Sequence, residues 1–202
     1  MRKNQVILIH GMPATGKYTM AKRLQEQGGI LLDNHYFHDM FAHSTEVPKE
    51  DLPEYWKEVG RLKKQFMKIL ARFYPKSEKV RYIFTSVMLK DEDLLERMEE
   101  FATQVHADFI PIELVARDDV LKNRCQADAR RARKKISSAT NMESFLKEHQ
   151  DQLPDYTHPN KLRIDVSTLN EDETFVLIQK HLAKFDQPHQ LQAIRNLPDY
   201  DR

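Results

Sequence analysis

The sequence predicts an α/β fold of three layers, in which a five-stranded parallel sheet lies between helices on both faces. Short apolar runs alternate along the chain with stretches that have helical spacing. A glycine-containing segment at residues 11–19 joins the first apolar run directly to the first helical stretch. Alternating strands and helices form parallel sheets, which are buried on both faces and bind ligands at the carboxyl ends of their strands.

The expected strands are short apolar runs at residues 6–10, 30–32, 80–88, 109–116 and 162–166. The first helix is predicted over residues 17–27 and is stopped by two consecutive glycines. A long amphipathic helix carries apolar residues on one side between residues 55 and 73, and Pro75 ends it.

Polar residues mark where the later helices begin. Asp91 and Asp118 are predicted to cap the helices that follow the third and fourth strands. Asn170 and Glu173 form the pattern of a capping box, and the helix that they start is expected to run to about residue 185.

Length and composition limit the organisation of the chain. Its 202 residues are enough for one well-packed domain, which we place at residues 1–185, followed by a tail at 186–202. A formal net charge of +1 argues against a general electrostatic attraction to nucleic acid or to an anionic membrane. The single cysteine, Cys125, excludes an internal disulfide, and no basic-then-apolar leader or membrane-length apolar run is present, so we expect a cytoplasmic protein.

Residues 11–19 read Gly-Met-Pro-Ala-Thr-Gly-Lys-Tyr-Thr and have the spacing of a phosphate-binding loop, in the required context of strand, loop and helix. The two glycines allow backbone N–H groups to turn inward around a phosphate, and the helix adds the positive end of its dipole. Lys17 would reach the outer phosphates. The predicted nucleotide-binding residues are Gly11, Met12, Pro13, Ala14, Thr15, Gly16, Lys17, Tyr18 and Thr19.

Tyr18 stands where a short hydroxyl usually contacts magnesium, and its own hydroxyl lies too far from the backbone for that role. The loop resembles that of adenylate kinases, GxPGxGKGT, in which the threonine is displaced by one residue. This resemblance implies that Thr19 touches an inner phosphate and that Mg²⁺ is held largely through water.

Over residues 5–185 the chain resembles P-loop kinases of small metabolites, a group that includes shikimate kinase, gluconate kinase and chloramphenicol phosphotransferase. The resemblance implies a P-loop NTPase fold that uses ATP and Mg²⁺, with a helical acceptor-binding insert at 34–75 and a lid at 118–150. Asp33 lies where the members that phosphorylate a hydroxyl carry a carboxylate. Residues 161–169 resemble the strand and loop that border the adenine.

Asp33 suits the role of general base on chemical grounds as well. Phosphoryl transfer needs one group that orients the attacking hydroxyl and takes its proton. A carboxylate at the carboxyl end of the second strand, across from the glycine loop, can do this. The alternative is a simple strand-end acid or a helix cap.

The acceptor is expected to be a neutral hydroxyl compound rather than a nucleoside monophosphate. Residues 33–48 contain no Lys or Arg to hold a second phosphate and are instead rich in aromatic and imidazole groups. His35 is predicted to contact the acceptor beside Asp33. Arg61 is a further candidate contact that would allow an acidic acceptor, although it and the neighbouring Lys63 and Lys64 can equally form a solvated face.

Two weaker patterns lie nearby. His35 and His38 are three residues apart, but without a third fixed ligand they favour hydrogen bonding or substrate contact over a transition metal. Tyr55 and Trp56 could line the acceptor pocket or belong to the core.

The densest positive run of the chain falls in the predicted lid. Arg124 and Arg131 share one side of a helix and are predicted to fold over the nucleotide and stabilise the charge on the transferring phosphoryl group. The alternatives are a solvated basic helix or a nucleic-acid patch. Residues 137–140 would form the lid hinge, and residues 142–149 the returning helix.

The third strand lacks the acid that many P-loop enzymes use to hold metal-bound water, and Thr85 and Ser86 stand there instead. Three functions therefore remain open: an ATP-dependent kinase of a small-molecule hydroxyl, a nucleotide-gated binding protein, and a polynucleotide or nucleotide kinase. The first is favoured by Asp33 and the arginines. A monomer or a homodimer is expected.

Overall fold

The fold is known from a computed structural model, which describes residues 4–33, 47–74, 79–87, 93–127, 136–149 and 155–186. Its centre is a five-stranded sheet in the order β2-β3-β1-β4-β5. All four strand pairs are parallel. The strands are β1 (Asn4–His10), β2 (Ile30–Leu32), β3 (Arg81–Ser86), β4 (Ala107–Val115) and β5 (Leu162–Asp165). The five predicted strands are thus confirmed, with ends that move by one or two residues.

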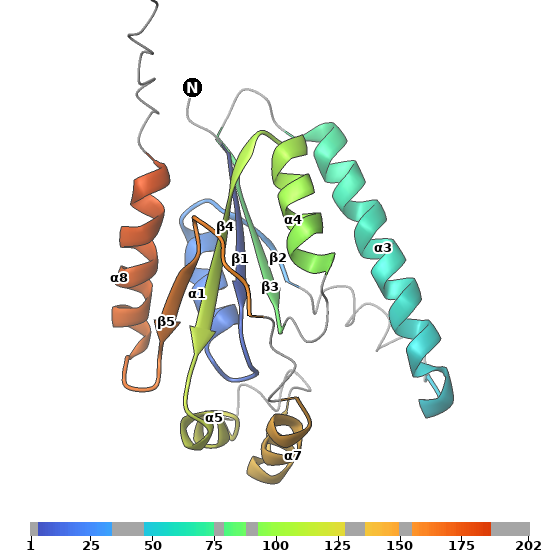
Figure 1. Cartoon of the computed structure of the whole chain (residues 1–202), viewed down its shortest axis with the longest axis vertical. Helices are drawn as coiled ribbons and strands as arrows, with labels where there is room; N and C mark the ends of the chain where they lie inside the picture. Colours follow the sequence, from blue (N-terminus) through green and yellow to red (C-terminus); the bar gives the residue numbers. More distant parts are fainter. Residues whose placement is uncertain are drawn as a thin grey trace, which may run out of the picture.

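Helices cover both faces of the sheet, so the predicted three-layer architecture is confirmed (Figure 1). One face carries α1 (Lys17–Glu26) and α8 (Glu171–Leu182), which continues into the 3-10 turn η3 (Ala183–Phe185). The other face carries α4 (Asp93–Gln104) and α3 (Leu52–Phe73), which the 3-10 turn η1 (Lys49–Asp51) precedes.

Two shorter helices lie beyond the carboxyl ends of the strands. They are α5 (Asp118–Arg124) and α7 (Ala139–His149), and they pack against each other (Figure 1). Helix α7 matches the predicted returning helix but begins earlier, so residues 139 and 140 belong to its first turn and not to a hinge.

The central strand β1 explains why the core has two halves. All seven of its residues are buried, and successive side chains of a strand point to opposite faces. Ile7 and Ile9 therefore enter the core under α1 and α8, whereas Val6 and Leu8 enter the core under α4. β1 pairs with β3 on one edge and with β4 on the other, so its carboxyl end is held on both sides.

The helix starts agree with the sequence in one case and differ in another. Asn170 and Glu173 form the predicted capping box, with reciprocal bonds of 2.9 Å and 2.8 Å between side-chain oxygen and backbone N–H. The prediction for Asp118 is wrong, because Arg117 occupies the N-cap and Asp118 is the first helical residue, where its charge still faces the helix dipole. Asp91 lies outside the described residues.

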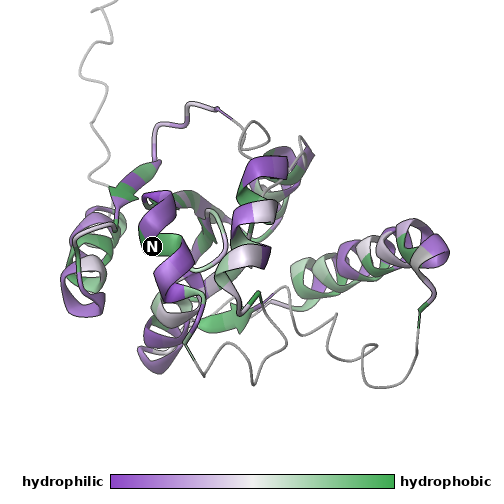
Figure 2. Cartoon of the chain, turned by 90° about the horizontal axis from the view of Figure 1, so that it is seen from below, coloured by the Kyte–Doolittle hydropathy of each residue, from purple (hydrophilic) through white to green (hydrophobic). Residues whose placement is uncertain are grey.

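Helix α3 buries less of its apolar side than its pattern predicts. Among its described side chains only Val59 is buried, while Ile69 is 48% and Phe73 71% exposed. Contact with the core comes from partly buried residues near its carboxyl end, Met67 and Leu70. Figure 2 shows α3 at one side of the molecule, with hydrophobic colour remaining on part of its surface.

No helix within the described ranges is both long and apolar enough to cross a lipid bilayer.

Two glycines give a matched test of the packing. A Cβ at Gly29 would lie 2.4 Å from Ile83 Cδ1 and 2.9 Å from the Leu24 carbonyl oxygen, whereas a Cβ at Gly60 in α3 would meet nothing within 4 Å. We expect Gly29→Ala to lower the free energy of unfolding by about 1–3 kcal/mol, because β3 and α1 must separate. Gly60→Ala should raise it by up to about 1 kcal/mol through helix propensity. Urea denaturation of both variants measures the difference, and equal effects would contradict the packing.

Candidate active site

The glycine loop leaves β1 in a conformation that requires its glycines. Gly11 has φ +139°, and a Cβ there would lie 2.1 Å from the carbonyl oxygen of Leu114 in β4. Gly16 is the N-cap of α1 with φ +93°. Ala14, between them, is also left-handed at φ +68°. The loop therefore turns back over the end of the sheet, close against β4, before it enters the helix.

Lys17 spans the loop from inside. Its Nζ donates to the carbonyl oxygens of Gly11 and Met12, both at 2.7 Å. The hydroxyl of Thr15, which is buried, donates to the same Met12 oxygen at 2.9 Å. These bonds fix the curvature of the backbone and bring the ammonium group within the ring of the loop, where an anion would meet it.

The two residues after Lys17 have separate environments. Tyr18 is half-buried, and its side chain packs against the hydrophobic core under α1 and α8. Thr19 is half-buried in the first turn of α1. The departure from the usual loop pattern at Tyr18 thus has a packing role.

The loop is also packed from above by the two short helices. Met12 and Ala14 are each 8% exposed and form an apolar cluster with Leu121 of α5 and Met142 of α7. Cys125 is fully buried in the same cluster, and its Sγ donates to the Lys122 carbonyl oxygen at 3.0 Å. The segment predicted as a lid therefore has a base that rests directly on the glycine loop.

Asp33 follows β2 and is 2% exposed. Its Oδ1 accepts a hydrogen bond of 2.6 Å from the hydroxyl of Thr85 in β3. Register explains the contact, because β2 pairs with β3 and Thr85 lies beside Ile9 of β1. A buried carboxylate is thus oriented at the carboxyl edge of the sheet, one strand away from the start of the glycine loop. Thr85 stands at the position where the sequence lacks an acid.

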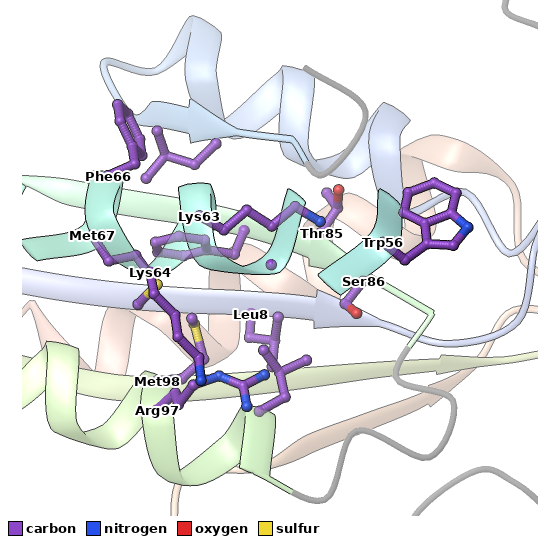
Figure 3. Close-up of a pocket in the computed structure, with 14 residues that line it drawn as sticks. Leu8, Trp56, Lys63, Lys64, Phe66, Met67, Thr85, Ser86, Arg97 and Met98 are labelled. Carbon is purple, nitrogen blue, oxygen red and sulfur yellow. The ribbon is translucent and has the colours of Figure 1, made fainter. Parts of the chain in front are cut away.

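A pocket of about 340 Å³ lies between α3, α4 and the sheet, and Thr85 forms part of its wall (Figure 3). Most of its lining is apolar, from Leu8 and Phe84 in the sheet to Met98 in α4. The pocket also contains hydroxyl and basic groups. The full lining is Leu8, Leu32, Trp56, Gly60, Lys63, Lys64, Phe66, Met67, Phe84, Thr85, Ser86, Leu94, Arg97 and Met98.

The basic side chains of the pocket differ from those favoured by the sequence. Arg61 is exposed, pairs with Glu58 on the same helix, and does not line the pocket. Lys63 and Lys64, which the sequence suggests to be a solvated face, do line it, together with Arg97 of α4. Lys64 is nevertheless exposed and Lys63 is half-buried, so the expectation of a solvated face stays open. Trp56 is a pocket residue that is 47% exposed, and not a core residue.

Arg124 lies at the end of α5 and reaches the loop between β5 and α8. Its Nη2 donates to the carbonyl oxygens of Val166 at 2.8 Å and Leu169 at 3.2 Å. Arg124 therefore ties the predicted lid to the predicted adenine-bordering segment in this structure. Arg131 and His35 lie outside the described residues.

A buried polar cluster beneath the glycine loop is absent from the sequence interpretation. His10, the last residue of β1, is 1% exposed, and its Nε2 lies 2.6 Å from the Tyr156 hydroxyl. Its Nδ1 has no hydrogen-bond partner among the described residues. Lys161 Nζ lies 3.0 Å from Glu113 Oε2 and 3.9 Å from the centre of the Tyr156 ring. His10 and Tyr156 are 146 residues apart, so no local pattern could reveal the cluster.

Burial, and then the charges of Lys161 and Lys17, lower the pKa of His10 to about 3. Burial, with the charge of Glu113, raises the pKa of Tyr156. His10 is therefore a neutral imidazole beneath the loop at physiological pH, and it adds no charge next to Lys17.

Within the described part of the chain, no group of three or more His, Cys, Asp or Glu side chains could hold a metal ion. The histidines at 35 and 38 are outside that part.

A glycine loop with left-handed residues between a buried strand and a helix, on a parallel sheet of this order, defines a P-loop nucleotide-binding protein. The chain belongs to the AAA domain family, which it matches over residues 6–151. A search of curated protein sequences finds no match.

Solved structures with the same fold include several kinases. A protein from Chloroflexus aurantiacus, provisionally described as a kinase, has a TM-score of 0.65 at 22% identity and covers 91% of this chain and 98% of its own. Shikimate kinase from Bacteroides thetaiotaomicron has a TM-score of 0.56 at 17% identity, and the match covers 90% of this chain and 98% of that one. A gluconokinase from Sinorhizobium meliloti has a TM-score of 0.54 at 11% identity, and the match covers 92% of this chain and 94% of that one. At these identities the likeness establishes the P-loop kinase fold.

The buried imidazole of His10 makes the free energy of unfolding depend on pH. Its native pKa of about 3 lies below the ordinary value of 6.5, so between these pH values the unfolded state binds more protons than the native state. The free energy of unfolding should therefore fall as the pH falls through this window, by about 1.4 kcal/mol per pH unit from this group.

His10→Gln should remove that component of the slope, as measured by urea denaturation at several pH values. His106→Asn, at an exposed position, controls for loss of an imidazole and should keep the wild-type slope. An unchanged slope in His10→Gln would mean that His10 is protonated in the folded protein.

Proposed function

We propose that this protein transfers the γ-phosphoryl group of ATP to a hydroxyl group of a small molecule bound between α3, α4 and the sheet. The observation that carries the proposal is the hydrogen bond between Thr85 and the buried carboxylate of Asp33. The bond supports the proposal because Thr85 lines the pocket and lies beside Ile9 of β1, the strand that leads into the glycine loop.

The glycine loop would hold the triphosphate. Its backbone N–H groups, the start of α1 and the Lys17 ammonium together supply positive charge for the β- and γ-phosphates. On binding, Lys17 would exchange its bonds to the Gly11 and Met12 carbonyls for bonds to phosphate oxygens.

Thr19 and Asp33 would hold Mg²⁺, with water completing the coordination, since hydroxyl and carboxylate oxygens are the ligands that this ion prefers. When bound, the ion supplies neutralisation of phosphate charge. Few such oxygen donors are found near the loop among the described residues, which is compatible with a mainly water-coordinated ion.

Asp33 would orient the acceptor hydroxyl and take its proton during transfer. The bond from Thr85 to Oδ1 would help to hold the carboxylate in a fixed orientation. In this arrangement Asp33 would be the general base, and Thr85 would be the side chain that orients it.

The helices above the loop would complete the site. We assign Arg124 to the part of the site that would bind the adenine, because its two hydrogen bonds to carbonyl oxygens hold the loop between β5 and α8. Arg131 remains the candidate for charge on the transferring phosphoryl group, and His35 for the acceptor. The related folds carry the names gluconokinase and shikimate kinase, and both names support a small hydroxylated acceptor.

A second candidate function is a nucleotide-gated binding protein. The packing of Met12 and Ala14 against α5 and α7 favours it, because a change in the loop on nucleotide binding would reach those helices directly. This function needs no base, so the effect of removing Asp33 separates the two candidates.

Asp33→Asn should bind ATP in the absence of Mg²⁺ like the wild type but, with Mg²⁺ present, lose phosphoryl transfer by about 10²- to 10⁴-fold, because the amide cannot accept the proton. Binding is measured with a fluorescent ATP analogue, and turnover by ADP release with and without a hydroxylated acceptor. Asp172→Asn, an exposed carboxylate of α8, is the matched control and should keep full activity. Unchanged turnover in Asp33→Asn would contradict the assignment of the base.

Arg124→Gln should raise the KM for ATP about tenfold with a smaller change in kcat, because two charge-assisted bonds to the β5–α8 loop are lost. Lys122→Gln, on the same helix and paired with the exposed Glu143, serves as the control. A fall in kcat of several orders of magnitude at unchanged KM would instead assign Arg124 to the transferring phosphoryl group.

A further inference from the structure

Helix α3 carries an apolar stripe that does not face the body of the protein. Leu62, Ile69 and Phe73 are all exposed. Because an α-helix turns by about 100° per residue, these three side chains lie within about 40° of one another around the helix axis. Met67 and Ala71, which pack against the core, lie about 140–180° away from Leu62. The stripe is therefore directed away from the sheet, on a helix at one side of the molecule (Figure 2).

Little of α3 is buried by its own chain. The helix has 22 residues, and Val59 is the one buried residue among those described in it. Helices in proteins are stabilised mainly by packing of their apolar side and less by helix propensity. A partner that covers the stripe of Leu62, Ile69 and Phe73 would supply burial that the single chain lacks.

Charge is separated along the same helix. Residues 49–58 contain four acidic and two basic residues, whereas residues 61–72 contain five basic residues and no acidic one. The Arg72 guanidinium lies 5.3 Å from the centre of the Phe73 ring. No ion pair of Lys68 or Arg72 occurs within the described part of the chain. The amino-terminal end of α3 is therefore net negative and the carboxyl-terminal end strongly positive.

The acidic residues near the start of α3 have counter-charges on their own helix. Glu54 pairs with Lys57 at 3.5 Å, and Glu58 pairs with Arg61. All four side chains are more than half exposed, and exposed pairs of this kind are weak. These carboxylates can therefore take part in a second ion pair without losing a strong one.

We propose that α3 forms the interface of a homodimer, in which the two copies of the helix pack antiparallel around a two-fold axis near Leu62. The acidic end of each helix then lies beside the basic end of the other, because an isologous contact pairs each end with its opposite. Glu54 lies opposite Arg72 of the partner copy. Glu58 lies opposite Lys68 of the partner copy. The exposed apolar side chains of both copies meet between these charges.

Two properties of α3 determine the partner and the strength of binding. An anionic membrane would attract the basic end of the helix but repel the acidic end, whereas a second copy complements both. A helix of 22 residues is about 33 Å long, and a pair of them would bury roughly 800 Å², which is at the low end of specific interfaces. We therefore expect a dimer that dissociates in the micromolar range.

Analytical ultracentrifugation of the wild type between about 2 and 200 µM should show a monomer–dimer equilibrium. Ile69→Gln should raise the Kd at least about tenfold, because it places an amide at the centre of the apolar contact. Val176→Gln in α8 is the matched control, since Val176 is 58% exposed compared with 48% for Ile69, and it should leave the Kd unchanged. Both positions are exposed, so both variants should fold, which circular dichroism checks.

Charge reversal tests the antiparallel arrangement. Glu54→Lys and Arg72→Glu should each raise the Kd about fivefold, because each change places like charges opposite one another twice in the two-fold pair. The double variant should return to within about threefold of the wild type, because the pair is then restored with its signs exchanged. None of these measurements uses nucleotide, so their outcome does not depend on the proposed kinase function.

A monomer at every concentration, an unchanged Kd in Ile69→Gln, or a double variant as weak as the single variants would overturn the proposal. A monomer that binds vesicles of phosphatidylserine and phosphatidylcholine, and loses that binding in Ile69→Gln, would instead assign the stripe to a membrane surface.

Discussion

The contact between Gly11 and β4 determines the geometry of the whole site. The Leu114 carbonyl oxygen occupies the space that a Cβ of residue 11 would need, so only glycine allows the chain to turn back at this point. The turn directs Met12 and Ala14 into the cluster with α5 and α7, and it brings the carbonyls of residues 11 and 12 around the Lys17 ammonium. The loop is therefore shaped by a strand that lies about a hundred residues further along the chain.

The remaining parts of the site are assembled by the register of the sheet. β1 is paired on both sides, and its partners place Ser86 and Glu113 beside His10 at the base of the loop. β3 in turn places Thr85 against Asp33, which follows β2. The buried Asp33 carboxylate, the glycine loop and the neutral imidazole of His10 thus depend on one set of parallel strand pairs. A shift of register by one residue would turn each of these side chains to the opposite face.

The features that follow from local chemistry could be predicted from the sequence. The glycine loop, the five strands and the capping box at Asn170 each depend on residues close together in the chain, and the structure confirms them. Contacts across long separations could not be predicted. The bond from Thr85 to Asp33 spans 52 residues, and neither the role of Arg97 in the pocket nor the burial of His10 leaves a local signal. The position of Lys63 and Lys64 beside the pocket depends on how α3 stands relative to the sheet, and amphipathic spacing alone does not give this.

The thiol of Cys125 lies at the junction of the glycine loop with α5 and α7, fully buried and bonded to a backbone oxygen of its own helix. Met12 and Ala14 belong to the apolar cluster around this sulfur, so movement of α5 and α7 away from the loop would expose it. The rate of alkylation of this single cysteine would therefore report how often the helices and the loop separate. A triphosphate bound to the loop would lower that rate if it stabilises the packed arrangement. The ratio of the two rates would give the coupling free energy between the ligand and the helices.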